Sequence, residues 1–192
     1  MMAQTELPTG YRTLLSIDLQ KNKKLAFLVN GLALVIGAIM VVAMQPFVSF
    51  FTLFDLSAGL LSYFCRFLTM LVGLVAYMIL HELVHGVAMK LCGTQKVKYG
   101  FTGLYAFAGS NDYYNKKSYI FIALAPVVLW GIVLLILNFL VPVSYFWVVY
   151  FIQIANLSGA AGDLYVTWKF SRLPADILVQ DSGVSMTVYS AE

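Results

Sequence analysis

Residues Leu25 to Met44 read LAFLVNGLALVIGAIMVVAM, an apolar run whose one strongly polar side chain is Asn30. An α-helix rises 1.5 Å per residue, so a run of about 20 residues covers roughly 30 Å, the thickness of the hydrocarbon core of a bilayer. Gln45 and Pro46 follow the run, and proline does not continue a helix. The stretch therefore predicts a membrane-spanning helix.

The composition of the whole chain also indicates a bilayer environment. Of the 192 residues, 61% are hydrophobic and 11% are Asp, Glu, Lys or Arg, and the mean hydropathy is +0.84. Soluble domains carry roughly 25% charged residues, so the composition argues against a water-soluble globular protein. The formal net charge is +3, from 12 basic and 9 acidic residues. This excess is too small for a nucleic-acid-binding surface, and nucleic acid is not an expected partner.

Three further stretches are long and apolar enough to cross the bilayer. They run from Phe67 to Lys90, from about Ser118 to Val141, and from about Ser144 to Trp168. Pro126 predicts a kink in the third span. Residues 45–66 are rich in Phe and Leu but contain proline, aspartate and serine, so either an interfacial helix or an extra span fits them. We expect an all-α membrane protein, a bundle of about four transmembrane helices.

Lysine and arginine indicate the orientation, because basic loops stay on the cytoplasmic side. Basic residues precede the first span, lie between the second and third, and follow the fourth, whereas the opposite loops contribute only Arg66. Four spans in the cell membrane with both termini in the cytoplasm satisfy this bias. The expected organisation is a cytoplasmic segment of residues 1–24, a transmembrane domain of residues 25–172 and a cytoplasmic tail of residues 173–192.

The second span contains ionisable residues at a depth where charge is costly. It reads His81-Glu82-Leu83-Val84-His85, and these are the two histidines of the chain. A charged group inside a bilayer costs on the order of 2.5 to 3.5 kcal/mol, so such groups usually have a function. Helix positions i and i+4 share one face, so both imidazoles can bind one metal ion. Glu82 projects beside that face, where a carboxylate can act as general base on a water at the metal.

A third ligand is needed, because a catalytic zinc site uses three protein ligands and a water. Asp163 in the fourth span is the best candidate, since it lies at about the depth of His81 and His85 in the four-span arrangement; Asp112 is the reserve. Residues 156–163 read NLSGAAGD, and small residues let helices approach closely. Asn156 lies two turns before Asp163 on the same face, where its amide would orient a ligand or a substrate. Interhelical hydrogen bonds without a metal are the structural alternative for both.

The motif HELVHG at residues 81–86, followed by an Asn and an Asp in a later span, resembles the site-2-protease type of intramembrane zinc metalloprotease. The chain is more similar still to the small multi-pass zincin peptidases, over most of residues 10–172. The segments SIDL at 16–19, KNK at 21–23 and ALAP at 123–126 contribute to this similarity.

The resemblance implies a ligand set and catalytic roles. His81, His85 and Asp163 would be zinc ligands, Glu82 the general base, and Asn156 a residue that contacts the substrate or the oxyanion. The site-2 family has a proline between its Asn and Asp and ends the segment in Leu-Asp-Gly. This chain has glycines there, and its Asp163 is followed by leucine.

Residues 97–115, between the second and third spans, mix aromatic residues with glycines and are too broken for a helix. We expect a short membrane-associated hairpin there, near the ionisable residues. Site-2-like proteases present an edge strand at this place that pairs with an unwound substrate. Strand addition is a general way to hold an extended peptide.

These features predict a zinc-dependent intramembrane or membrane-proximal peptidase. Its cofactor would be Zn²⁺, and its substrates would be membrane proteins or peptides in the lipid bilayer. The alternative is a non-proteolytic zinc-binding membrane protein, either a transporter or a catalytically silent scaffold. A transporter usually shows repeated halves with paired polar sites, and the sequence has no second cluster of histidines or carboxylates.

Overall fold

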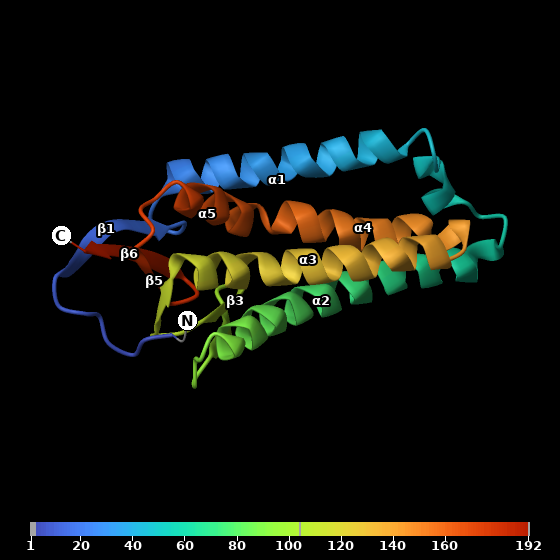
Figure 1. The fold of residues 1–192 in the computed structure, drawn as a ribbon. Coiled ribbons are helices and arrows are strands. Elements are labelled where there is room, and N and C mark those ends of the chain that lie inside the picture. The colour runs from blue at the N-terminus through green and yellow to red at the C-terminus, as the bar shows by residue number, and fades with distance from the viewer. Residues whose placement is uncertain (1–2, 104, 192) are drawn as a thin grey trace. The chain divides into compact units, whose positions relative to one another are not determined.

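The computed structural model describes residues 3–103 and 105–191 (Figure 1). The helices are α1 (Lys23–Met44), the 3₁₀ helix η1 (Phe50–Phe54), α2 (Gly59–Leu91), α3 (Lys116–Leu140), α4 (Val143–Gly159) and α5 (Ala161–Ser171). The strands are β1 (Tyr11–Asp18), β2 (Lys98–Phe101), β3 (Ala106–Gly109), β4 (Tyr113–Asn115), β5 (Leu178–Asp181) and β6 (Ser185–Ala191).

The strands correct the expectation of an all-α protein. In the described residues, β2 and β3 form the hairpin that the sequence predicts, and a second, four-stranded antiparallel sheet has the order β1-β6-β5-β4. β4 and β5 have three and four residues, and the four strands come from three separate parts of the chain, so the sequence carries no local signal for the sheet. The fold is mostly helical with two small sheets.

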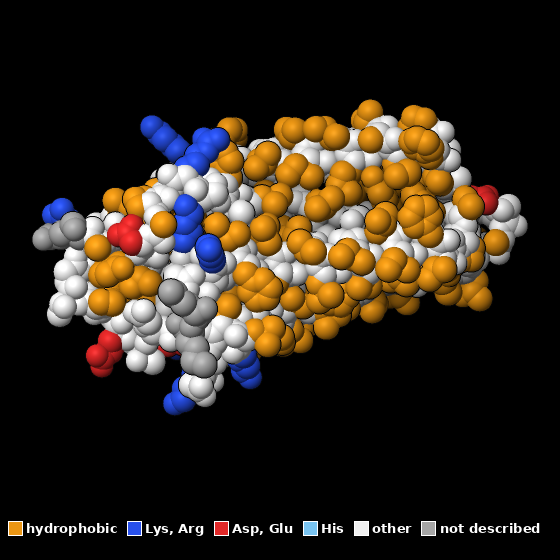
Figure 2. Space-filling model, in the orientation of Figure 1, with side chains coloured by type: hydrophobic (Ala, Val, Ile, Leu, Met, Phe, Trp, Pro, Cys, Tyr) orange, Lys and Arg blue, Asp and Glu red, His pale blue; other side chains and the backbone are white. Residues whose placement is uncertain are grey.

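Four helical segments among the described residues are long and apolar enough to cross a membrane, as expected. They are Lys23–Met44, Gly59–Leu91, Lys116–Leu140 and Val143–Ser171. The second starts at Gly59 rather than Phe67, because the apolar pattern of α2 continues further toward the N-terminus. Residues 45–66 form the short η1 and the first turns of α2, so the described part of this region contains no extra span. On the face shown in Figure 2, hydrophobic side chains cover the long helices, and Lys and Arg lie around the strands.

The contacts between residues divide the chain into two compact units. The first unit consists of Met1–Val29, Leu80–Pro126 and Gly162–Glu192; the second consists of Asn30–Ile79 and Val127–Ala161. The core of the first unit joins the four-stranded sheet to helical residues. Tyr114, Phe170, Val179 and Val188 are all fully buried in it.

The second unit contains a cluster of aromatic and aliphatic side chains around Trp147, which is 1% exposed and donates a hydrogen bond to the carbonyl of Ser49 at 2.9 Å. Arg66 is buried as well, and its guanidinium donates to the backbone carbonyls of Thr52 and Asp55. Arg66, which lies inside α2 rather than in the preceding loop, thus holds the connection that contains η1 against this helix.

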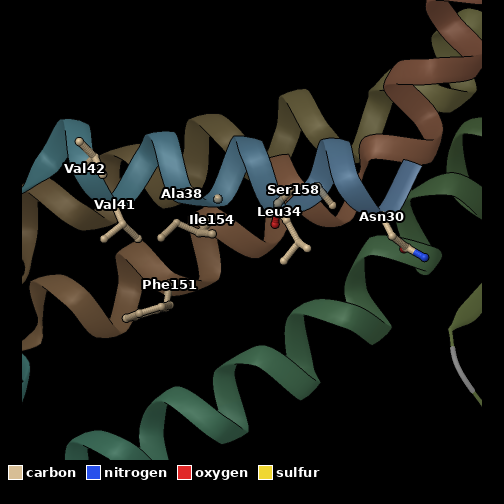
Figure 3. A pocket seen from close by; sticks show the side chains of 10 residues that line it. Asn30, Leu34, Ala38, Val41, Val42, Phe151, Ile154 and Ser158 are labelled. Atoms are coloured by element: carbon tan, nitrogen blue, oxygen red, sulfur yellow. The ribbon is translucent and has the colours of Figure 1, made fainter. Parts of the chain in front are cut away.

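An apolar groove of about 800 Å³ lies between α1 and α4 within the second unit (Figure 3). It is lined by Asn30, Ala33, Leu34, Gly37, Ala38, Val41, Val42, Phe151, Ile154 and Ser158. This lining contains no acidic, basic or histidine side chain. The ionisable residues that the sequence singles out, His81, Glu82, His85 and Asp163, belong to the first unit.

Candidate metal centre

Helix α2 presents His81 and His85 on one face, as the i and i+4 spacing requires. Their ring centroids are 4.8 Å apart, and each residue is 9% exposed. Buried imidazoles in a mostly apolar helix are costly unless a partner satisfies them. The two imidazoles therefore need a polar partner that both of them can contact.

Asp163 is that shared partner, and it lies in the first turn of α5. A carboxylate is favoured at a helix N-terminus by the exposed N–H groups and the helix dipole. Its Oδ2 lies 3.5 Å from His81 Nε2, and its Oδ1 lies 3.7 Å from His85 Nε2. Each carboxylate oxygen thus faces a different histidine.

These atoms suit a zinc ion in type and spacing. One ligand atom from each of the three residues can be chosen so that all lie within 4.8 Å of one another. Tetrahedral zinc with bonds of about 2.0–2.1 Å places its ligand atoms roughly 3.3 Å apart, close to the two histidine–carboxylate distances. Two imidazoles and one carboxylate also match the ligand set of many catalytic zinc sites.

A backbone carbonyl fixes the second histidine. His85 Nδ1 lies 2.9 Å from the carbonyl oxygen of Ile122 in α3. A carbonyl only accepts hydrogen bonds, so Nδ1 carries a proton, and Nε2, on the side of Asp163, is the nitrogen left to bind a metal. Zinc-binding histidines commonly have such a partner on the nitrogen that does not bind the metal.

Glu82 lies beside the two histidines, and its side chain is neither fully buried nor exposed. Its carboxylate accepts a hydrogen bond from the backbone amide of Ala108 in β3. The hairpin predicted for residues 97–115 therefore lies next to Glu82.

Glycines let the hairpin approach closely. A Cβ atom at Gly86, the residue after His85, would overlap the phenol ring of Tyr99 in β2. On the other side, the Phe107 ring of β3 lies against Gly100 and against Gly183 in the β5–β6 turn. The hairpin is thus held between the histidine helix and the C-terminal strands.

A buried polar network continues from the hairpin into the four-stranded sheet. The amide of Ser110 donates to the carbonyl of Asp181 at 2.7 Å, and the Tyr119 hydroxyl donates to Asp181 Oδ2 at 2.6 Å. The Tyr114 hydroxyl lies 2.6 Å from Ser110 Oγ and 2.5 Å from Thr94 Oγ1. Burial raises the pKa of Asp181 above its ordinary value, and burial likewise raises the pKa of Tyr114.

No sequence pattern predicts this network, since its members are ordinary polar residues from loops, strands and α3 that are spread along the chain. The carbonyl of Ile122 was also missed, although the proline four residues later is a usable signal. Proline removes the amide that would otherwise bond to that carbonyl.

Asn156 belongs to the second unit and is fully buried there. Its Oδ1 accepts a hydrogen bond from the Tyr77 hydroxyl at 3.0 Å, and its Nδ2 donates to the carbonyl of Val127 at 3.1 Å. These contacts connect α2, α3 and α4, which matches the structural alternative stated for this residue. A catalytic role for Asn156 stays a prediction. Asp112 is not in the group of three described residues that can share a metal ion.

Comparison with known proteins gives the family. Residues 74–178 match the family described as "Putative zincin peptidase", and this match includes 105 of the 192 residues. The chain belongs to this family. The matched region contains both histidines, Glu82 and Asp163.

One curated relative is an uncharacterized 24.7 kDa protein in the gap 5′ region of Pyrococcus woesei. It is 33% identical over 118 residues, which cover 59% of this chain and 51% of the relative. The chain therefore spans about half the length of the curated relative that it matches. No solved structure matches the chain significantly.

Proposed function

We propose that this chain is a zinc-dependent peptidase that cleaves peptide bonds of membrane-associated substrates at the centre formed by His81, His85 and Asp163. The observation that supports it most strongly is the position of Asp163, whose two oxygens face the two histidines at 3.5 and 3.7 Å. The HExxH motif alone supplies two ligands and a base. Asp163 adds the third ligand from another span.

In this proposal His81 Nε2, His85 Nε2 and the Asp163 carboxylate would hold the ion. Bound zinc supplies Lewis acidity, which makes a peptide carbonyl more electrophilic and a water molecule more acidic. Hydrolysis consumes one water, and it yields a carboxylic acid and an amine.

Glu82 moves the proton. As general base it takes a proton from the attacking water, and as general acid it then gives that proton to the nitrogen of the leaving amine. The Ala108 amide orients the carboxylate through the hydrogen bond that Glu82 accepts. The low polarity of the surroundings strengthens this contact.

Strand β3 offers a place for an extended substrate. In the described part of the chain β3 pairs with β2 alone. The amide of Ala108 donates to Glu82 and the amide of Ser110 donates to Asp181. Because both acceptors lie outside the hairpin, the backbone groups of these two residues point away from β2. By the two-residue period of a strand, the N–H and C=O of Ala106 share that edge. Since the amides of Ala108 and Ser110 already donate, a substrate peptide would pair with this edge at Ala106, two residues from the amide that contacts Glu82.

The test uses the full chain purified in detergent, with zinc measured by elemental analysis and cleavage measured on fluorescein-labelled casein, an unfolded polypeptide. Wild type should hold about one zinc and cleave casein. Glu82→Gln should keep the zinc and lose cleavage by at least about 100-fold, because a general base typically contributes 10² to 10⁴. His81→Ala should lose both.

Glu6→Gln is the matched control, since it removes the same charge at an exposed position in the N-terminal segment. It should behave as wild type. Cleavage by Glu82→Gln at the wild-type rate would overturn the proposal. Bound zinc without cleavage of casein or of a co-reconstituted single-span substrate would favour the silent scaffold. Zinc flux into vesicles that depends on His81 would favour the transporter.

A further inference from the structure

We propose that Pro126 is a positioning residue for the metal centre, and that it acts by freeing the carbonyl of Ile122 to hold His85. The inference rests on the metal centre of the proposed function. It assigns a role to a residue that neither binds metal nor contacts substrate.

The backbone ladder of α3 explains the freed carbonyl. In an α-helix the N–H of residue i donates to the C=O of residue i−4. Pro126 lies inside α3, which runs from Lys116 to Leu140, and proline has no N–H to donate to Ile122. The proline ring also crowds the carbonyl four residues back and tilts it away from the helix axis.

The freed carbonyl needs a new donor. Ile122 is 2% exposed and Pro126 is fully buried, so water does not reach this position. An unsatisfied carbonyl in a membrane helix is costly, and prolines are tolerated in such helices where neighbouring groups satisfy the freed carbonyl. His85 Nδ1, at 2.9 Å, is the donor.

The same hydrogen bond sets the state of His85. Because the carbonyl oxygen only accepts, the proton stays on Nδ1 and the ring is fixed with Nε2 directed to Asp163 Oδ1 at 3.7 Å. The other tautomer would place a hydrogen on the nitrogen that has to bind the metal. A partner on the opposite nitrogen is therefore a requirement for a good ligand here.

An amide at position 126 would remove this arrangement. It would compete with His85 for the Ile122 carbonyl and draw that oxygen back toward the helix axis. The Pro126→Ala variant should thus keep α3 and loosen the His85 ring.

Two measurements on the purified full chain test the inference. Zinc affinity is measured by competition with a chelating dye, and the zinc-loaded protein is labelled with ¹⁵N-histidine for NMR. Two histidines in the chain give two imidazole spectra, and His81 serves as an internal reference. Pro126→Ala should weaken zinc binding by about tenfold, at the lower end of the effects seen for partners of metal ligands. The His85 Nδ1 proton should exchange faster with water, while that of His81 stays unchanged.

Two further variants separate the missing amide from other effects. Pro142→Ala makes the same change at the N-cap of α4 in the second unit and should bind zinc as wild type does. Placing the α-hydroxy analogue of alanine at position 126 removes the ring but also lacks the N–H, because the linkage is an ester. This variant should restore zinc affinity and slow exchange of the Nδ1 proton.

The outcomes are distinct from those of the peptidase test. Wild-type zinc affinity in Pro126→Ala would overturn the inference, as would an ester variant as weak as Pro126→Ala, since the ring would then be the cause. A wild-type chain that binds no zinc would overturn both proposals. Zinc bound without peptide cleavage would overturn the peptidase and leave the role of Pro126 standing.

Discussion

The phenol ring of Tyr99 lies against Gly86, the residue that directly follows His85 in α2, so closely that a Cβ atom at Gly86 would overlap it. The hairpin is thus in contact with the helix one residue beyond a proposed zinc ligand. Tyr99 is 48% exposed, so its ring covers the glycine from the surface.

Replacing Gly86 with alanine should have different effects in two backgrounds. Gly86→Ala in the wild type clashes with the Tyr99 hydroxyl, and this half-exposed ring has to move off the helix, which offsets the gain in helix propensity. In a Tyr99→Ala background the clash is gone, and alanine should stabilise the helix by about 1 kcal/mol relative to glycine. Denaturant unfolding in detergent measures both. The same effect of Gly86→Ala in the two backgrounds would contradict the contact.

The turn between β5 and β6 should need glycine at position 183 both for its positive φ and for the contact with Phe107. Comparing Gly183 with Gly10 separates these two causes. Gly183 has φ +85° and faces the Phe107 ring, whereas Gly10 has φ +86° and open space where a side chain would be. Gly10→Ala should lose about 1 to 2 kcal/mol from backbone strain alone. Gly183→Ala should lose more, because the hairpin has to move. Thermal unfolding shifts of equal size would show that Phe107 does not press on this turn.

Asp163 should be needed for zinc binding while Asp112 is not. Asp163→Asn keeps the shape of the side chain but removes its charge and makes one donor atom an N–H group. We expect zinc affinity to fall by more than about 100-fold, beyond the effect of losing an outer partner. The same dye competition with Asp112→Asn should give the wild-type value. Equal losses would make Asp112 a ligand as well.

Asn156→Ala should reduce stability and leave zinc binding unchanged. The substitution takes the partner from the Val127 carbonyl and one partner from the Tyr77 hydroxyl. Hydrogen bonds between membrane helices are worth on average about 0.6 kcal/mol and at most about 1.7 kcal/mol, and the loss should be in this range. A large loss of casein cleavage at unchanged stability and zinc content would instead support the catalytic role predicted from the resemblance.

The buried carboxyl of Asp181 should make stability fall as pH rises above its ordinary pKa of 3.8, because burial raises the pKa of Asp181 in the folded state. Between the two pKa values the folded protein binds more protons than the unfolded chain, so stability decreases with pH there. Asp181→Asn should flatten this part of the curve. Chemical unfolding from pH 4 to pH 7, compared between variants, measures it. Parallel curves for wild type and Asp181→Asn would contradict the raised pKa.

The long apolar runs predict the helices well, because length and hydropathy decide whether a segment crosses a bilayer. The start of α2 was placed at Phe67 instead of Gly59, since the apolar pattern continues gradually from the preceding loop. The four-stranded sheet could not be predicted in the same way. Its pairing joins Tyr11 to Ala191 and Asn115 to Leu178, and no local pattern signals contacts between such distant residues.

The candidate site likewise contains some features that the sequence predicts and others that it does not. The spacing of His81 and His85 follows from helix geometry, so the sequence suffices to place the two imidazoles together. Asp163 was inferred from depth in the bilayer, and the structure brings it to both histidines. The Ala108 amide and the Ile122 carbonyl are backbone groups of a kind that nearly every residue has, so only three-dimensional packing can select them.

The pairing of β1 with β6 has a consequence for biosynthesis. Residues 11–18 are made before their partner strand, residues 185–191, and the β5–β6 turn that supports Phe107 is made just before that strand. At about 5 to 20 residues per second, roughly 10 to 30 seconds separate the two strands. During that interval the β5–β6 turn that contacts Phe107 is missing. The four-stranded sheet, and with it the contact that fixes the hairpin, therefore forms only after residues 185–191 have been translated.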